Sequence, residues 1–209
     1  MVEVKKYKYE SIPGFTNETD FEFLQKVCED APDSGIIVEL GSCFGRSAVF
    51  FAETMRKLGK QYEIYAVDIY WTGLIRRMYK EYLEYLQGDI SLVYDLLDPN
   101  KILDKQLSMI ELTKKFCSGF PEITIVKHDV FRQIPKPLHN KKISIVFEDS
   151  AHSYKSTMHC LENYFPRLGP NGIFCGDDYH WPEVSKAVKD YAKKNDLKIH
   201  TDNKIWRLE

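Results

Sequence analysis

The sequence of 209 residues has no apolar run long enough to cross a membrane. Its opening residues, MVEVKKYKYE, lack the apolar stretch of a secretory signal. It also lacks a concentrated basic region: the net charge is -2, and lysine and arginine are scattered. Proteins that bind nucleic acids or anionic membranes usually carry such a region. We therefore expect a cytoplasmic protein that binds neither nucleic acid nor a membrane.

Paired cysteines are missing as well. The chain has five cysteines, an odd number, and no two of them form a C-x-x-C pair. Because several lie in apolar runs, buried free thiols in a reducing compartment are favoured over disulfides or a zinc site. The composition, 44% hydrophobic and 29% charged, is ordinary for a globular protein. The length fits one well-buried core, so we expect a single domain over residues 1–209.

Short apolar runs alternate with amphipathic segments along most of the chain. We expect strands at residues 36–40, 63–68, 123–126, 143–147 and 173–176. We expect helices at about 19–30, 45–58 and 153–165, and from residue 182 onward. Thr19 and Glu22 fit a capping box, and the run GPNG at 169–172 reads as a loop. Residues 198–207 suggest a terminal hairpin. This alternation predicts an α/β fold with a parallel sheet covered on both faces.

Two segments stand outside this alternation. Residues 1–34 form an N-terminal arm and helix. Residues 71–97, rich in Tyr, Leu and Met at near-helical spacing, predict an inserted helical element near the edge of the sheet. Extra core, an oligomer contact and a lid over an active site remain open for this insertion. As a lid, it would offer aromatic rings to an acceptor, from Tyr70, Trp71, Tyr79 and Tyr82.

The expected strands end in glycine or acidic residues, and ligands of such sheets bind at the carboxyl ends of the strands. The first strand runs into Gly41 and Gly45, spaced G-x-x-x-G, which suits a tight turn beside a ligand. The dinucleotide motif G-x-G-x-x-G and the phosphate loop are both missing. Asp68, which ends the next strand, could accept hydrogen bonds from both hydroxyls of a ribose. A helix cap or a solvated turn residue is the structural alternative for Asp68.

Four runs carry a resemblance to a known family: VELGSCFGRSA (38–48), AVD (66–68), IVFEDSAHSY (145–154) and GPNGIFCGDDYHWPEV (169–184). They resemble the class I S-adenosylmethionine-dependent methyltransferases. Within that class they are similar to the group of macrocin O-methyltransferase and the cephalosporin hydroxylase-like proteins. The resemblance implies a Rossmann-like, doubly wound, mostly parallel seven-stranded sheet. It also implies a C-terminal antiparallel hairpin and a helical insertion after the second strand.

The resemblance also implies roles for individual residues. The loop with Glu39, Gly41, Ser42 and Gly45 would wrap the methionine part of S-adenosylmethionine. Asp68 would bind the ribose, and Asp129 would lie beside the adenine. Mg²⁺ or another hard divalent cation would be held by Asp149, Asp177 and Asp178, with His152 as the general base. Two departures are Ser150-Ala151, where the group often has Gly-Asp, and Cys43, where many class I enzymes have glycine.

The residue types suit this chemistry. Carboxylates without nearby cysteine form a hard oxygen site, and a histidine can take a proton near neutral pH. Consecutive strand residues point to opposite faces, so Asp177 and Asp178 can share a cation only if the strand has ended by that point. We expect an O-methyltransferase acting on a small hydroxylated acceptor such as a sugar or a catechol-like compound, and a homo-oligomer is a further expectation. A nucleotide-dependent oxidoreductase and a non-catalytic partner protein remain alternatives.

Overall fold

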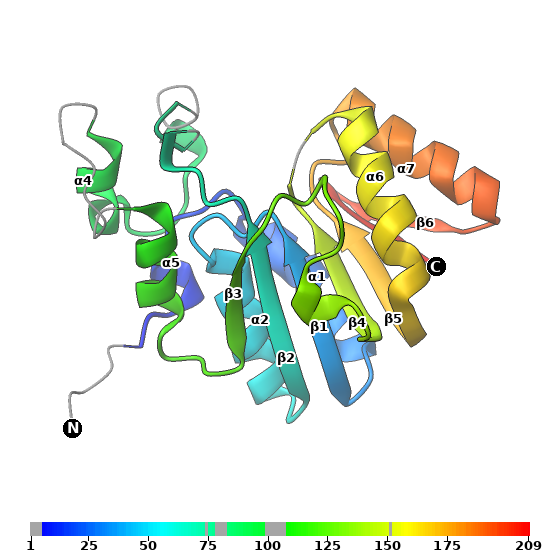
Figure 1. Ribbon diagram of the computed structural model, residues 1–209, viewed down its shortest axis with the longest axis horizontal. Helices are drawn as coiled ribbons and strands as arrows, with labels where there is room; N and C mark the ends of the chain where they lie inside the picture. The colour runs from blue at the N-terminus through cyan, green and yellow to red at the C-terminus, as the bar shows by residue number, and fades with distance from the viewer. Residues whose placement is uncertain (1–5, 74, 78–82, 99–107, 151) are drawn as a thin grey trace.

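The computed structural model describes residues 6–73, 75–77, 83–98, 108–150 and 152–209. The strands are β1 Ser34–Leu40, β2 Gln61–Asp68, β3 Ile123–Lys127, β4 Ile143–Glu148, β5 Leu168–Gly176, β6 Ile199–Asp202 and β7 Ile205–Leu208. They form one seven-stranded sheet in the order β3-β2-β1-β4-β5-β7-β6. β1 to β5 are parallel, and β7 runs antiparallel to β5 and β6 (Figure 1). The predicted sheet and its C-terminal hairpin are confirmed.

Helices cover both faces of this sheet. The helices on these faces are α1 Glu18–Asp30, α2 Arg46–Lys57, α5 Met109–Cys117, α6 Tyr154–Tyr164 and α7 Pro182–Asn195, and the short α4 Tyr94–Leu97 lies apart from the sheet. One apolar core joins α1, α2 and α5 to residues such as Ile37 and Ile145, and the other joins α6 and α7 to Val38 and Val146. Neighbouring residues of one strand thus enter opposite cores, which explains why the central strands are continuously apolar. Among the described residues, no helix is long and apolar enough to cross a membrane.

Two local predictions were wrong. The capping box of α1 is formed by Asn17 and Asp20, with Asp20 N donating to Asn17 Oδ1 over 3.1 Å and Asn17 N donating to Asp20 Oδ2 over 2.9 Å. The helix begins one residue earlier than expected, so Thr19 and Glu22 lie inside it. The run GPNG lies within β5 instead of in a loop. The pairing with β4 shifts between Ile143 and Ile145, so an irregularity in the ladder accommodates this run.

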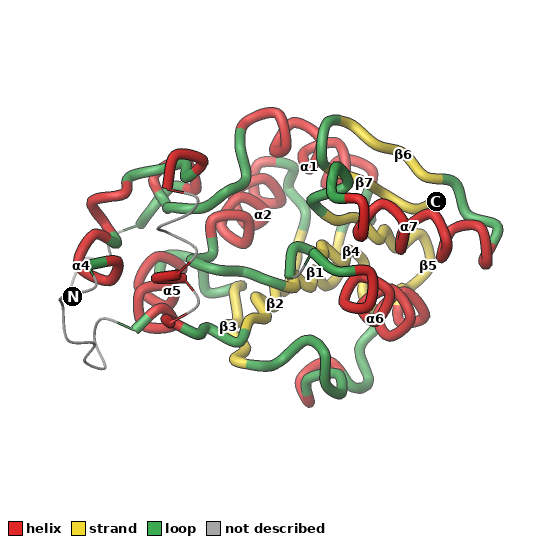
Figure 2. Tube along the Cα trace, turned by 90° about the horizontal axis from the view of Figure 1, so that it is seen from above, coloured by secondary structure: helices red, strands yellow, loops and turns green. Residues whose placement is uncertain are grey.

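The described parts of the insertion are helical, as predicted, but in short pieces. They include the 3₁₀ turns η2 Leu83–Tyr85 and η3 Ile90–Leu92, followed by α4. Figures 1 and 2 both place α4 at the opposite end of the molecule from α6 and α7. Tyr70 is buried, and its hydroxyl donates to Ala66 O over 3.0 Å, so its ring belongs to the core. Trp71 is 61% exposed. Tyr79 and Tyr82 lie outside the described residues, and the lid stays a prediction.

The N-terminal arm is fastened to the start of α2 by Arg46, whose side chain is buried. Its guanidinium donates to four main-chain carbonyls, at distances of 2.8 to 3.1 Å, from Tyr9, Glu10, Ile12 and Thr16. It also lies 5.3 Å from the ring centroid of Phe21. Gly14, in the same arm, pairs with Gln87 of the insertion. Arg46 therefore links the start of α2 to the arm, and the pairing of Gly14 with Gln87 links the arm to the insertion.

Arg46→Met should destabilise the fold by roughly 3 kcal/mol or more, because several buried carbonyls would lose their donors at once. The free energy of unfolding in urea measures this. Arg56→Met is the matched control, since Arg56 is 40% exposed and pairs with Glu122 on the surface. That control should lower the free energy of unfolding by at most about 1 kcal/mol. Equal losses in the two variants would show that the carbonyl contacts of Arg46 contribute little.

Candidate cofactor and acceptor site

The ends of β1 and β4 meet at Gly41. Gly41 N donates to Val67 O over 2.8 Å, and Asp149 N donates to Leu40 O over 2.8 Å. The φ angle of Gly41 is +93°, and a Cβ atom there would lie 2.0 Å from Asp149 O. Only glycine allows so close an approach. Gly41 therefore brings the glycine loop against the residue that opens the acidic cluster.

The loop from Ser42 to Gly45 is a tight left-handed turn into α2. Cys43 has φ 50° and Gly45 has φ 84°, and Gly45 N donates to Ser42 O over 2.7 Å. The hydroxyl of Thr113, in α5, donates to Cys43 O over 2.9 Å. A Cβ on Gly45 would lie 2.7 Å from Cys117 Sγ, so glycine is required here by space as well as by conformation. The loop is thus held from both the sheet and α5.

Asp68 lies where the resemblance placed it, at the end of β2 beside this loop. Its Oδ2 accepts a hydrogen bond from Cys43 N over 2.9 Å, and its Oδ1 accepts one from Tyr70 N over 2.7 Å. Burial raises the pKa of Asp68, and these bonds oppose the shift. Each carboxylate oxygen can accept a further hydrogen bond. Asp68 therefore orders the glycine loop and keeps acceptor capacity for a ligand.

Glu39 is fully buried next to the loop. Burial raises the pKa of Glu39 to about 7, while hydroxyl donors oppose the shift. Its Oε1 accepts a hydrogen bond from the Ser47 hydroxyl. Its Oε2 and the Ser42 hydroxyl make no hydrogen bond of ordinary geometry among the described residues, although Ser42 is one of the hydroxyls that oppose the shift. Buried polar atoms normally have partners, so Glu39 and Ser42 mark a polar position beside the loop.

Asp149, His152 and Asp178 come together beyond the ends of β4 and β5. One possible ligand atom from each lies within 4.8 Å of the others. His152 Nε2 lies 2.6 Å from Asp178 Oδ2. That hydrogen bond raises the pKa of His152; it also lowers the pKa of Asp178, although burial acts in the opposite direction. Burial and the neighbouring carboxylates of Asp177 and Asp178 raise the pKa of Asp149 well above its usual range. Such crowding of acids favours a cation.

Asp177 has a different partner. β5 ends at Gly176, and Asp178 has a left-handed φ of 63°, so the chain turns sharply between the two acids. Asp177 is buried, and its Oδ2 lies 2.6 Å from Lys204 Nζ. The two neighbouring acids therefore have different partners, and both lie near enough to raise the pKa of Asp149. Asp129, at the end of β3, accepts a hydrogen bond from Phe131 N over 3.0 Å and pairs with Arg132. Its place beside an adenine stays a prediction.

Sequence reasoning missed three residues of this region. Glu148 is buried, and its Oε1 accepts from the Ser150 hydroxyl over 2.6 Å. The ring of Trp181 lies 4.9 Å from that of His152, centroid to centroid, with 31° between the planes. Lys204 reaches Asp177 from the terminal hairpin. Glu148 could have been found as the acid preceding Asp149, and Trp181 from the run GDDYHWPEV. Nothing in the sequence links Lys204 to Asp177.

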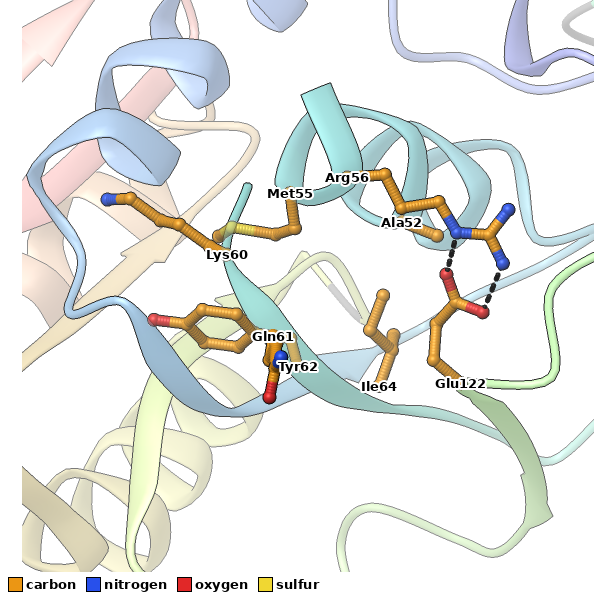
Figure 3. A pocket seen from close by; sticks show the side chains of 8 residues that line it. All are labelled: Ala52, Met55, Arg56, Lys60, Gln61, Tyr62, Ile64 and Glu122. Carbon is orange, nitrogen blue, oxygen red and sulfur yellow. Dashed lines mark hydrogen bonds and ion pairs between the residues drawn. The ribbon is translucent and has the colours of Figure 1, made fainter. Parts of the chain in front are cut away.

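Two cavities lie at the opposite edge of the sheet. The first, of about 280 Å³, lies between the end of α2 and the start of β2, where Met55, Tyr62 and Ile64 line it (Figure 3). The ion pair between Arg56 and Glu122, at 2.6 Å, is at its side (Figure 3). The second, of about 450 Å³, lies near residues 139–142 and Arg167, before β4 and β5 begin. Neither cavity adjoins Gly41 or the acidic cluster.

Comparison with known proteins agrees with this geometry. The family model described as a methyltransferase domain matches residues 38–179. A comparison with curated protein sequences gives no significant match. The O-methyltransferase NovP is structurally similar, with a TM-score of 0.63 and 16% identity over 91% of this chain and 79% of that one.

Two further structures have the same fold. CalS11, a TDP-rhamnose 3'-O-methyltransferase of calicheamicin biosynthesis, gives a TM-score of 0.57 and 19% identity over 93% of this chain and 81% of that one. A methyltransferase-like protein from Streptococcus mutans, SMU.1697c, solved in complex with SAH, gives 0.55 and 12% over 90% and 96%. The matched domain, the strand order and the glycine loop all indicate the same family. The chain belongs to the methyltransferase domain family and is a class I S-adenosylmethionine-dependent methyltransferase.

Proposed function

We propose that the protein transfers the methyl group of S-adenosylmethionine to a hydroxyl of a small molecule, such as a sugar or a catechol-like compound, with help from a divalent cation. One observation carries the proposal: Gly41 joins the glycine loop directly to the cluster of Asp149, His152 and Asp178. A donor bound at the loop would thus lie next to groups that can activate a hydroxyl. The solved relatives NovP and CalS11, both O-methyltransferases, support the same class of acceptor.

The loop fits the donor through its own polar groups. Glu39 and Ser42 place a buried carboxyl and a hydroxyl beside the loop, suited to the ammonium and carboxylate of the methionine part. Asp68 offers its remaining acceptor capacity to the ribose hydroxyls. Asp129 would lie near the adenine. The family match favours this donor over the nicotinamide cofactor of an oxidoreductase, which was the alternative enzyme.

The acidic cluster fits a hard divalent cation such as Mg²⁺. Its carboxylates crowd together, and Asp149 gains relief from repulsion when a cation binds beside it. Asp149 and Asp178 would hold the cation. When bound, it would lower the pKa of the acceptor hydroxyl. The site is open to solvent on the side of His152, whose side chain is 36% exposed, so an acceptor can enter there.

His152 is the proposed general base. The hydrogen bond between Nε2 and Asp178 fixes the ring and leaves Nδ1 as the nitrogen that can accept a proton. Stacking against Trp181 limits rotation of the ring. His152 takes the proton of the acceptor hydroxyl while the oxygen of that hydroxyl bonds to the methyl carbon. The bond from carbon to sulfur breaks, and the sulfur keeps that electron pair, which gives S-adenosylhomocysteine.

Asp68→Ala should weaken binding of S-adenosylhomocysteine by at least about tenfold, because charge-assisted bonds contribute roughly 1.5–3 kcal/mol each. Isothermal titration calorimetry measures this affinity. Thr113→Val is the matched control, since it removes another bond to the loop, the one to Cys43 O, and leaves Asp68 in place. The control should change the affinity by less than about fivefold, in line with the loss of one neutral hydrogen bond. Equal effects would mean that Asp68 acts only by ordering the loop.

The function itself is tested by incubating the protein with S-adenosylmethionine and panels of sugar nucleotides, free sugars and catechols. Formation of S-adenosylhomocysteine is measured, and mass spectrometry locates the added methyl group. We expect methylation at a hydroxyl oxygen. Methylation at nitrogen or carbon would contradict the proposal.

A further inference from the structure

Lys204 is a half-buried cation beside the acidic cluster, and it comes from the C-terminal hairpin. It lies in the turn between β6 and β7, and its side chain is 17% exposed. Its Nζ lies 2.6 Å from Asp177 Oδ2 and 3.1 Å from Asp20 Oδ2, at the start of α1. Both partner side chains are almost entirely buried, at 3% and 0% exposure. The ion pair between Lys204 and Asp177 is therefore shielded from solvent by the surrounding protein.

The terminal hairpin also grips the main chain around Asp177. Trp206 Nε1 donates to Asp177 O over 2.9 Å, and Tyr179 N donates to Lys204 O over 2.8 Å. The Trp206 ring packs so closely on Gly176 that a Cβ there would lie 2.5 Å from it. The side chain of Asp177 is occupied at its other oxygen too, since Oδ1 accepts from Asp178 N over 2.6 Å. Both carboxylate oxygens of Asp177 are therefore occupied, one by Lys204 Nζ and the other by the main-chain N–H of Asp178.

Asp178 has a different partner from Asp177. Its carboxylate faces His152, and a possible ligand atom lies within 4.8 Å of those of His152 and Asp149. Asp177 is not part of that group. The two acids of the run GDD therefore have different partners, one a lysine and the other a histidine.

We propose that Lys204 is a positioning residue that holds Asp177 out of the cation's ligand set, so that Asp149 and Asp178 are its carboxylate ligands. The inference rests on the proposed cation-assisted methyl transfer. It departs from the ligand set that the sequence resemblance implied, in which Asp177 was a third ligand. Lys204 satisfies the charge of Asp177 and keeps the net negative charge of the cluster low. A cation held by two carboxylates keeps more positions open for oxygens of an acceptor.

Binding of Mn²⁺, as a spectroscopic substitute for Mg²⁺, tests the inference without any need for turnover. Free Mn²⁺ is measured by electron paramagnetic resonance in titrations of the wild type and three variants. The variant Asp177→Asn/Lys204→Met removes both members of the ion pair together. We expect its Mn²⁺ affinity to stay within about threefold of wild type, because the two changes leave the net charge beside the cluster unchanged and remove no proposed ligand. Asp149→Asn, a true ligand change, should weaken binding at least about tenfold.

Lys204→Met alone gives a result that damage to the fold could not produce. It removes a positive charge and frees Asp177 to turn toward the cluster, so Mn²⁺ should bind at least about tenfold more tightly. Lys204→Arg should keep the wild-type affinity, since it preserves the charge. If Lys204→Met fails to fold, the double variant carries the test alone. Affinity for S-adenosylhomocysteine confirms that each variant is folded.

Two results would overturn the inference. One is a loss of Mn²⁺ binding in the double variant as large as in Asp149→Asn, which would make Asp177 a ligand. The other is a wild-type protein that binds no Mn²⁺. Methyl transfer measured in the presence of chelator separates this failure from that of the proposed function. Transfer that continues in chelator would leave an O-methyltransferase with a different way of activating its acceptor.

Discussion

Treatment with EDTA should abolish methyl transfer to a working acceptor, while binding of S-adenosylhomocysteine and the melting temperature stay unchanged. The reason is the separation of two sets of groups. The donor is expected at the glycine loop, whose bonds come from Asp68, Thr113 and the main chain. The cation is expected at Asp149 and Asp178, where carboxylates crowd together. Removing the cation should therefore stop activation of the hydroxyl without touching the cofactor site.

The variant Asp149→Asn should reproduce the effect of the chelator. It should keep cofactor affinity because its side chain does not contribute to the loop; Asp149 meets Gly41 through the main chain. Adding Mg²⁺ back should restore the wild type and leave Asp149→Asn inactive. Full activity of the wild type in EDTA would disprove the cation mechanism. His152 would then act alone as base, in a metal-independent methyltransferase.

The fold was predictable because its signals are local. Each parallel strand contains a short apolar run, and β4 and β5 are followed by helices that begin near a recognisable signal, Ser153 before α6 and Pro182 in α7. The two wrong local predictions, the cap of α1 and the run GPNG, arose where two alternative structures fit the sequence pattern almost equally well. Asn17 caps α1 although Thr19 also fits the pattern, and β5 continues through Gly169–Gly172 because its pairing with β4 tolerates an irregularity.

The site was predictable only in part. Gly41, Asp68, Asp149 and His152 follow strand ends, and parallel strands bring their ends to one edge. The direction of a side chain after a strand has ended depends on the conformation of the turn. Asp178 adopts a left-handed conformation that no sequence pattern predicts. The partner of Asp177 comes from residue 204, in a separate hairpin. Contacts of that kind depend on tertiary packing, which short motifs do not encode.

His152→Ala should lower the rate of methyl transfer by about a hundredfold to ten-thousandfold, the usual contribution of a general base. His152 lies at the start of α6, where its ring is held between Asp178 and Trp181. Single-turnover measurement with saturating donor isolates the chemical step. Affinity for S-adenosylhomocysteine should not change, because none of the described contacts of His152 involves the glycine loop.

His180→Ala is the matched control. Its Nδ1 lies 4.0 Å from Asp178 Oδ1, and its side chain is 56% exposed. His180 therefore faces the same carboxylate as His152 does, but it lies too far from that carboxylate for a hydrogen bond. We expect its rate to stay within about threefold of wild type, as for other exposed charges. Added imidazole should restore part of the activity of His152→Ala, because the cavity left by the ring can admit a small base. A loss of similar size in both histidine variants would assign the effect to the surroundings of Asp178 and would mean that His152 is not the proton acceptor.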